Sequence, residues 1–402
     1  MSDAYIPRIP DEIWEYVFEA LEITVPSEKW WQKRSLVNES QRRLLLSLCL
    51  VCHQFRRCAQ RLLSKALLLD GAEPHNDRKF IRALRELALR PGFGQNTRIL
   101  TVDNNFGTGV HDLQVDNELL ASAINLMDLP PRFRQFLESS HFEAQSTSPA
   151  PLCLLFTPNV ELLEITLGET PLLLSWFLSG SLELEKSSFL SKTEDDEPGN
   201  ADYGDGYADD KVVVRAYANF GLPRLKKVHL KNRGVGSATP ITDIEAAFLH
   251  PGVEIMRTRG LDWRAVHIPK RRWPNVTSSI RTLELTECIM DARSMEDMLL
   301  LCPKLEYLKI VLADRGQATG IRYADYWINM NSVGKALRRY GQNLAAFDLY
   351  TPNFSGYLHG AIGSLQDLHK LRDLKITQRD LIGKIDISTL NTAVPHFNID
   401  SR

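Results

Sequence analysis

Two different spacings of hydrophobic residues divide the chain into a short first part and a long second part. In the first part, apolar residues recur three and four positions apart, the spacing of one face of an α-helix. Within residues 6–21, Ile13 and Val17 follow this spacing, and Pro10 and Asp11 suit a first helical turn. The spacing therefore predicts an amino-terminal region built from helices.

A longer apolar stretch, residues 42–69, predicts more helix with a break near His53, because about 28 residues is long for one globular helix. Residues 77–90 predict a further amphipathic helix that Pro91 and Gly92 end. The predicted buried face of the longer stretch comprises Leu44, Leu45, Leu48, Val51, Cys52 and Phe55, continued by Leu62, Leu63, Leu67 and Leu68.

The second part of the chain repeats the pattern Leu-x-x-Leu-x-Leu with aliphatic substitutions. From residue 225 onward most intervals between copies are 25–28 residues, within the period of a leucine-rich repeat. Longer gaps elsewhere indicate insertions or lost copies. The clear copies are Val160/Leu163/Ile165, Leu225/Val228/Leu230, Ile280/Leu283/Leu285, Leu305/Leu308/Ile310, Leu344/Phe347/Leu349 and Leu371/Leu374/Ile376, and the weak ones are Thr97/Leu100/Val102 and Val253/Met256/Thr258.

Each copy predicts a short strand whose aliphatic side chains enter a shared core while the alternating positions face outward. Stacked neighbours bury what one unit cannot cover. The expected fold class is α/β: all-α helices at the amino terminus, then an irregular leucine-rich-repeat solenoid with parallel strands on its concave face and helices outside. Its outward side chains either bind a protein substrate or are merely solvated: Lys227, His229, Lys231, Glu284, Tyr307, Lys309, Asp348, Tyr350 and Lys375.

The amino-terminal residues carry a second, more specific pattern. Ile9-Pro10 precedes an acidic-Ile pair, and a Leu-rich segment ends in Leu50-Val51-Cys52 with Phe55 three residues later. In this order the pieces resemble an F-box over residues 6–65, although the connection of residues 22–40 is longer than in that family.

An F-box followed by leucine-rich repeats is similar to a substrate-receptor subunit of an SCF-type (cullin–RING) ubiquitin ligase. The resemblance implies a Skp-family adaptor as partner, a protein substrate on the repeats, no cofactor and no catalysis by this chain. It also implies an F-box domain over residues 1–70, a linker helix over 71–96 and a substrate-binding domain over 97–402. The implied adaptor-binding residues are Ile9, Pro10, Ile13, Val17, Leu50, Val51, Cys52 and Phe55.

Composition narrows the class of protein without naming it. The 402 residues carry a net charge of −2, which argues against wholesale binding to nucleic acid or a membrane. The amino terminus does not read as a signal peptide, and no run of about 18 apolar residues occurs. Six scattered cysteines are too few for a disulfide framework. We therefore expect a reducing compartment, the cytoplasm or the nucleus.

Cys49-x-x-Cys52-His53 matches the local pattern for attaching a c-type haem. Covalent haem attachment needs a targeting signal that is not visible, and a zinc site needs a second pair of ligands that the sequence does not supply. Packing of two small side chains on a helix, with no metal, is the favoured interpretation.

Residues 192–211 contain eight acidic residues and no aliphatic side chain beyond Ala, which predicts a disordered, solvated loop. A calcium site is the sharper alternative, but the order of ligands in an EF-hand is absent.

Residues 257–274 interleave six basic side chains with Trp263 and Trp273. Charge combined with stacking is typical of nucleic-acid binding, so a nucleic-acid-associated protein stays an alternative. A substrate-binding edge and a solvated loop with buried tryptophans remain open as well, and so does a protein-interaction scaffold outside ubiquitination. Neither a phosphate-cradling loop nor a serine or zinc hydrolase motif occurs.

Overall fold

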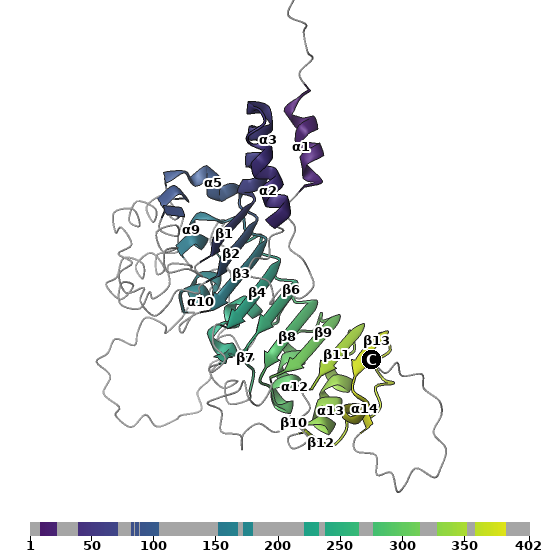
Figure 1. Ribbon diagram of the computed structural model, residues 1–402. Helices are drawn as coiled ribbons and strands as arrows, with labels where there is room; N and C mark the ends of the chain where they lie inside the picture. The colour runs from purple at the N-terminus through teal and green to yellow at the C-terminus, as the bar shows by residue number, and fades with distance from the viewer. Residues whose placement is uncertain are drawn as a thin grey trace, which may run out of the picture. The chain divides into compact units, whose positions relative to one another are not determined.

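The fold is described from a computed structural model of the chain, in which helices precede a long row of strands (Figure 1). No helix in the described part of the chain is long and apolar enough to cross a membrane. The structure describes residues 9–21, 39–70, 82–83, 85–87, 89–103, 152–167, 172–179, 221–232, 238–264, 276–313, 328–351 and 358–382.

The described residues between 9 and 64 form three helices, and helices are what their spacing predicts. Pro10 immediately precedes the first helix, and Asp11 and Glu12 place negative charge in its first turn, where the helix dipole favours it. One helix ends at Leu48 and the next begins at His53, so the predicted break in the helix is confirmed. The three helices are α1 (Asp11–Glu19), α2 (Glu39–Leu48) and α3 (His53–Ser64).

A nine-stranded sheet follows, in the order β1-β2-β3-β4-β6-β8-β9-β11-β13. The pairs β1–β2, β2–β3, β3–β4, β8–β9, β9–β11 and β11–β13 are all parallel. Helices together with this parallel sheet confirm the predicted mixed α/β class. The strands are β1 (Ala66–Asp70), β2 (Ile99–Asp103), β3 (Leu162–Leu167), β4 (Lys227–Asn232), β6 (Ile255–Arg259), β8 (Thr282–Cys288), β9 (Tyr307–Leu312), β11 (Ala346–Tyr350) and β13 (Asp373–Ile376).

The aliphatic positions of the repeat form the core of this sheet. Leu283, Leu308 and Phe347 stand opposite one another on neighbouring strands, and each is at most 1% exposed. Thr97 and Thr258, which make two copies look weak, are fully buried in the same role. The repeat therefore identifies strands correctly even where a polar residue replaces an aliphatic one.

The contacts divide the chain into two compact units: residues 1–233, 243–255 and 273–276, and residues 234–242, 256–272 and 277–402. In the second unit α12 and α13 pack side by side (Figure 1). The first unit also contains α5 (Pro91–Asn96), α9 (Leu152–Phe156), α10 (Leu172–Ser179) and α11 (Glu245–Phe248), and the second contains α12 (Ala292–Leu301), α13 (Met330–Tyr340) and α14 (Gln378–Ile382).

Short elements complete the second unit. Two small parallel pairs form beside the main sheet, and a 3-10 turn spans Ile241–Asp243. The pairs join β5 (Thr239–Pro240) to β7 (Leu261–Asp262) and β10 (Ile328–Asn329) to β12 (Leu358–His359).

Three predictions about burial and boundaries are wrong. Leu67 and Leu68 lie in strand β1, paired with β2, and do not continue the helix. Leu374 is 39% exposed, because β13 is the last strand of the sheet and lacks a neighbour on one side. Leu44, Val51 and Cys52 are exposed although the helical pattern assigns them to a buried face.

Candidate interaction surfaces of the helices and the sheet

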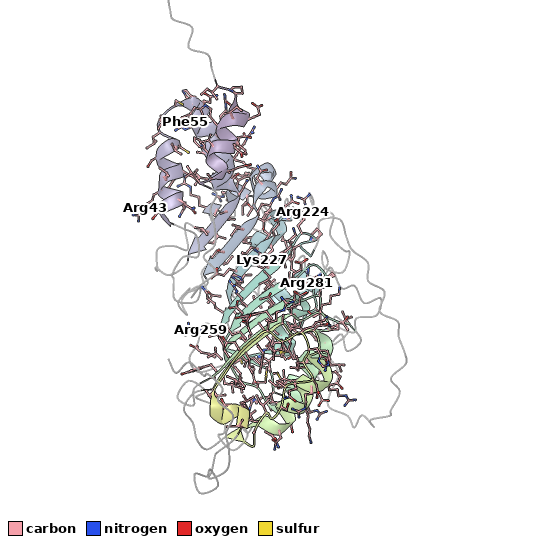
Figure 2. The ribbon with its side chains drawn as sticks, turned by 90° about the vertical axis from the view of Figure 1, so that its right-hand side faces the viewer. Arg43, Phe55, Arg224, Lys227, Arg259 and Arg281 are labelled. Carbon is pink, nitrogen blue, oxygen red and sulfur yellow. The ribbon has the colours of Figure 1, made fainter. Side chains whose placement is uncertain are left out.

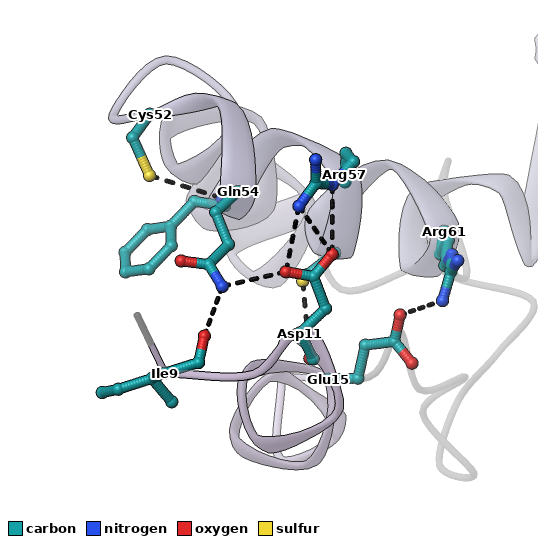
Figure 3. A network of polar contacts seen from close by, with 9 residues as sticks. Ile9, Asp11, Glu15, Cys52, Gln54, Arg57 and Arg61 are labelled. Atoms are coloured by element: carbon teal, nitrogen blue, oxygen red, sulfur yellow. Dashed lines mark hydrogen bonds and ion pairs between the residues drawn. The ribbon is translucent and has the colours of Figure 1, made fainter. Parts of the chain in front are cut away.

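Polar contacts fix the first helix against the third. Arg57 donates to both carboxylate oxygens of Asp11 at 3.0 and 3.1 Å. The Gln54 amide donates to Asp11 Oδ1 at 2.9 Å and also to the Ile9 carbonyl. The hydrogen bond from Gln54, followed by the Arg57 contacts, lowers the pKa of Asp11. The network therefore holds the start of α1, from Ile9 to Asp11, against α3 (Figure 3).

A second pair extends this attachment by one helical turn, because Glu15 accepts from Arg61. Glu15 lies four residues after Asp11, and Arg61 lies four residues after Arg57. Residues four apart share one face of a helix, so α1 and α3 meet along a line of matched charges.

An aromatic cluster seals the inner side of the three helices. The centroid of the Phe55 ring lies 4.5 Å from that of Trp14 and 5.3 Å from that of Phe18. Both pairs of rings meet nearly edge to face, an arrangement that aromatic pairs prefer. Phe55 thus belongs mainly to the internal core, whereas the sequence places it among the adaptor-binding residues. The buried members of this core are Phe18, Leu45, Cys58, Ala59 and Leu62.

The cysteines of the Cys-x-x-Cys-His pattern serve the turn between two helices. Cys52 precedes α3, and its sulfur accepts the Phe55 backbone N–H at 3.4 Å, as an N-cap residue does. Cys49 is half-buried against the core, and burial raises its thiol pKa. Within the described residues, no group of three or more His, Cys, Asp or Glu side chains is placed to hold a metal ion.

The outer side of the three helices is strongly apolar. On α1, Ile13, Tyr16 and Val17 share one face at spacings of three and four, with exposed fractions of 54%, 78% and 48%. Leu50 and Val51 stand in the turn before α3 with 81% and 64% exposed. Large apolar side chains exposed on one face of a helix make these residues candidates for an interaction site. We name this set the helical apolar surface: Ile9, Ile13, Tyr16, Val17, Leu44, Leu46, Leu50 and Val51.

The helical apolar surface overlaps the predicted adaptor-binding set without matching it. Pro10 and Cys52, which are also in the predicted set, are exposed too. Tyr16, Leu44 and Leu46 were missed by sequence reasoning. The spacing of Tyr16 from Ile13 could have revealed it, whereas three consecutive leucines at 44–46 give no indication that only Leu45 turns inward.

The outward face of the sheet in the second unit carries charges that alternate from strand to strand. Glu284 stands opposite Lys309, which stands opposite Asp348, which stands opposite Lys375. Arg257 begins the row, with its Nε 3.0 Å from Glu284 Oε1. Opposite charges on facing strands stabilise a sheet, and the Arg257–Glu284 ion pair neutralises one end of this row internally.

Tyrosines flank the charged row. Tyr307 is partly buried, and burial, with smaller contributions from Glu284 and Asp348, raises the pKa of its hydroxyl. Tyr350 is 54% exposed at the carboxyl end of β11. In the second unit, all of the predicted outward residues therefore lie on one face, as expected, with Tyr350 and Lys375 the most accessible.

The outward face of the first unit differs from the prediction. His229 is 2% exposed and is not displayed, and its opposite residue on β3, Glu164, is also 2% exposed. Lys231 forms an ion pair with Glu164 and is mostly shielded. Lys227 alone of the three is exposed, at the amino end of β4 (Figure 2). The alternation of the strand puts His229 on this face, but the folded chain covers it there.

The basic segment that suggested nucleic-acid binding is internally compensated in its described portion. Arg259 pairs with Glu287 at 2.7 Å, and Arg264 pairs with Asp262 at 2.7 Å, in addition to the Arg257 contact. Trp263 is 1% exposed. These arginines are therefore engaged by carboxylates, and residues 265–275, including Trp273, lie outside the described residues, as does the acidic stretch 192–211.

Comparisons with known proteins do not assign the chain to a family. No protein-family model matches it, and no curated protein matches it.

Proposed function

We propose that this chain is a substrate-recognition subunit of an SCF-type cullin–RING ubiquitin ligase. In this proposal α1–α3 form an F-box that docks on a Skp-family adaptor, and the strands and helices after them form a leucine-rich-repeat solenoid that holds a protein substrate. The subunit works in the cytoplasm or nucleus and performs no chemistry. Its contribution is to bring a substrate close to the transfer machinery, which raises effective concentration and restricts geometry.

The helical apolar surface is the observation that carries this proposal. A folded chain does not gain stability from leaving Leu50 and Val51 in water, since each buried aliphatic side chain would contribute roughly 1.5–3 kcal/mol. A protein partner that covers them recovers this free energy. Interfaces of ordinary size bury about 800 Å² per partner, and a few central apolar residues usually dominate the affinity.

The arrangement of α1 supports the same partner. The Asp11 and Glu15 contacts hold α1 on α3, so Ile13, Tyr16 and Val17 point away from the core on a rigid helix. A rigid, already exposed surface binds without the cost of ordering a flexible segment.

Co-purification with the adaptor tests the proposal. We expect Leu50→Asp combined with Val51→Asp to abolish capture of a purified Skp-family adaptor, because two charges would be buried without partners. The combination Ile9→Ala with Pro10→Ala should act in the same direction. Leu300→Asp is the matched control, since Leu300 is an exposed leucine, 54% accessible, on α12 of the second unit. Undiminished capture by the Leu50/Val51 variant would refute the docking surface.

A reconstituted ligase separates a ubiquitin-ligase receptor from an interaction scaffold. Ubiquitin attached to the chain itself in the presence of adaptor, cullin and RING subunits gives a readout that needs no known substrate. A receptor is modified and the Leu50/Val51 variant is not. A scaffold captures the adaptor but stays unmodified, which would contradict the ligase assignment while leaving the docking surface intact.

A further inference from the structure

A hollow of about 630 Å³ opens at the amino ends of the strands of the second unit. The residues before β9, β11 and β13 donate their backbone N–H groups to the residue before the preceding strand: Glu306 to Arg281, Ala345 to Glu306 and Arg372 to Ala345. These four residues therefore stand side by side in one row across four strands. With strands about 4.8 Å apart, the row extends over roughly 14 Å.

The lining of this hollow is strongly basic. Arg281, Lys304, Lys370 and Arg372 contribute four cations, and Glu306 contributes the one carboxylate, so the lining has a net charge of +3 with His369 neutral. All four cations are exposed, which leaves them available to a ligand from solution.

The few internal contacts of the hollow leave most of this charge uncompensated. Glu306 accepts from Arg281 at 2.8 Å and neutralises it. Lys370 donates to the amide oxygen of Asn343 at 2.7 Å, which carries no charge. Among the described residues, neither Lys304 nor Arg372 has a carboxylate within ion-pair distance. On the outward face, by contrast, Arg257 is paired with Glu284 and Arg259 with Glu287.

We infer that this hollow binds an acidic segment of a protein, with carboxylates over about four consecutive residues. An extended chain advances about 3.3 Å per residue, so four residues cover the row from Arg281 to Arg372. Of the three uncompensated cations, Arg372 belongs to the row, whereas Lys304 and Lys370 stand two residues before Glu306 and Arg372. The three charges therefore lie before two different strands, which suits several carboxylates better than a single small anion. The inference names the chemistry of the substrate in the proposed function, and in that respect it rests on the proposed function.

The hollow is less suited to nucleic acid. Single-stranded nucleic acid is held by aromatic side chains on which bases stack, and the lining contains no Phe, Tyr or Trp.

Fluorescence anisotropy with the full-length chain tests the inference directly. The probe is a labelled twelve-residue peptide with four consecutive glutamates, and the comparison probe replaces these by glutamines. We expect the glutamate peptide to bind and the glutamine peptide not to bind. Affinity should fall steeply with added salt, because exposed charges are screened within about 10 Å at 0.1 M. Equal binding of both peptides, or tighter binding of an oligouridine, would overturn the inference.

Charge reversal places the binding on this hollow. Lys304→Glu combined with Arg372→Glu should weaken binding of the glutamate peptide at least tenfold. Lys375→Glu is the matched control, because Lys375 lies on the same strand as the row's last position but belongs to the outward face. If Lys375→Glu removes binding and the Lys304/Arg372 variant retains it, the peptide sits on the outward face and the inference is wrong. Capture of the adaptor by all of these variants is measured in parallel, so that failure of the peptide site is distinguished from failure of the docking helices.

Discussion

The helices α1–α3 and the strands of the second unit differ in how far their apolar side chains are exposed to water. In the strands, Leu283, Leu308 and Phe347 are at most 1% exposed, and outward charges such as Arg257 and Glu284 are paired. In the helices, Leu50 and Val51 are among the most accessible residues of their type. The strand region therefore completes its own burial, whereas the helical region leaves apolar area for another molecule to cover.

The largest expected effect comes from comparing two leucine substitutions, one in each region, by their free energy of unfolding. We expect Leu308→Ala to lower the free energy of unfolding by about 2–5 kcal/mol, because a fully buried leucine leaves a cavity. Leu50→Ala, at a position 81% exposed, should change it by less than about 0.5 kcal/mol. Urea denaturation of the two variants beside the unmodified chain gives both values. Comparable destabilisation by Leu50→Ala would mean that the helical apolar surface is part of the chain's own packing.

The sequence could predict the elements better than their environments. Helical spacing located α1 and the break before His53, because the pattern reports a local backbone geometry. In the same way, the Leu-x-x-Leu-x-Leu repeat located β2, β3, β4, β6, β8, β9, β11 and β13. Strand β1 was missed because Ala66–Asp70 follows α3 directly and its run of leucines suggests more helix. In the fold, Leu67 and Leu69 pair with Leu100 and Val102, as members of a repeat copy do. Exposure depends on distant contacts, so the burial of His229 and the accessibility of Leu44 could not be predicted.

The charged row of the sheet could have been anticipated from the repeat. Arg257 and Glu284 are 27 residues apart, and Arg259 and Glu287 are 28 apart. The first separation equals the interval of 27 residues between the repeat copies on β6 and β8, which places Arg257 and Glu284 at matching positions of neighbouring strands, and the second exceeds that interval by one. Glu287 needs one additional feature, a positive φ of 51° at an irregularity in the register of β8, and the sequence pattern does not indicate it.

A buried histidine, His250, makes the stability of the first unit sensitive to pH. His250 is 1% exposed, its Nε2 is 2.7 Å from the Gly221 carbonyl, and its Nδ1 accepts the Gly252 N–H at 3.2 Å. Burial lowers the pKa of His250 to about 4, against a smaller opposing effect of the Gly221 hydrogen bond. The folded state therefore binds this proton only near pH 4, whereas the unfolded state binds it near pH 6.5.

Between these two pH values the unfolded state holds more protons, so stability rises with pH and is lost as the pH falls from about 6.5 to 4. The pKa difference corresponds to a loss of about 3 kcal/mol. Urea denaturation at pH 7.5 and pH 4.5 should show a smaller difference in His250→Gln than in the unmodified chain. His53→Gln, at an exposed position that begins α3, is the control and should keep the original pH dependence. An unchanged pH dependence in His250→Gln would show that other groups cause the effect.

The smallest expected difference separates two ion pairs of the second unit. Arg257–Glu284 has side chains only 15% and 13% exposed, whereas the side chains of Arg281–Glu306 are 55% and 53% exposed. Double-mutant cycles on exposed pairs typically give about 0.2–1 kcal/mol. Shielding from water strengthens the attraction, so we expect more than about 1 kcal/mol of coupling for Arg257–Glu284. With alanine at each position and urea denaturation at 0.05 and 1 M NaCl, coupling in the exposed pair should vanish at high salt and coupling in the shielded pair should persist. Equal salt sensitivity of the two pairs would mean that water reaches Arg257 and Glu284 freely, and that the outward face is no better sealed than the rim of the basic hollow.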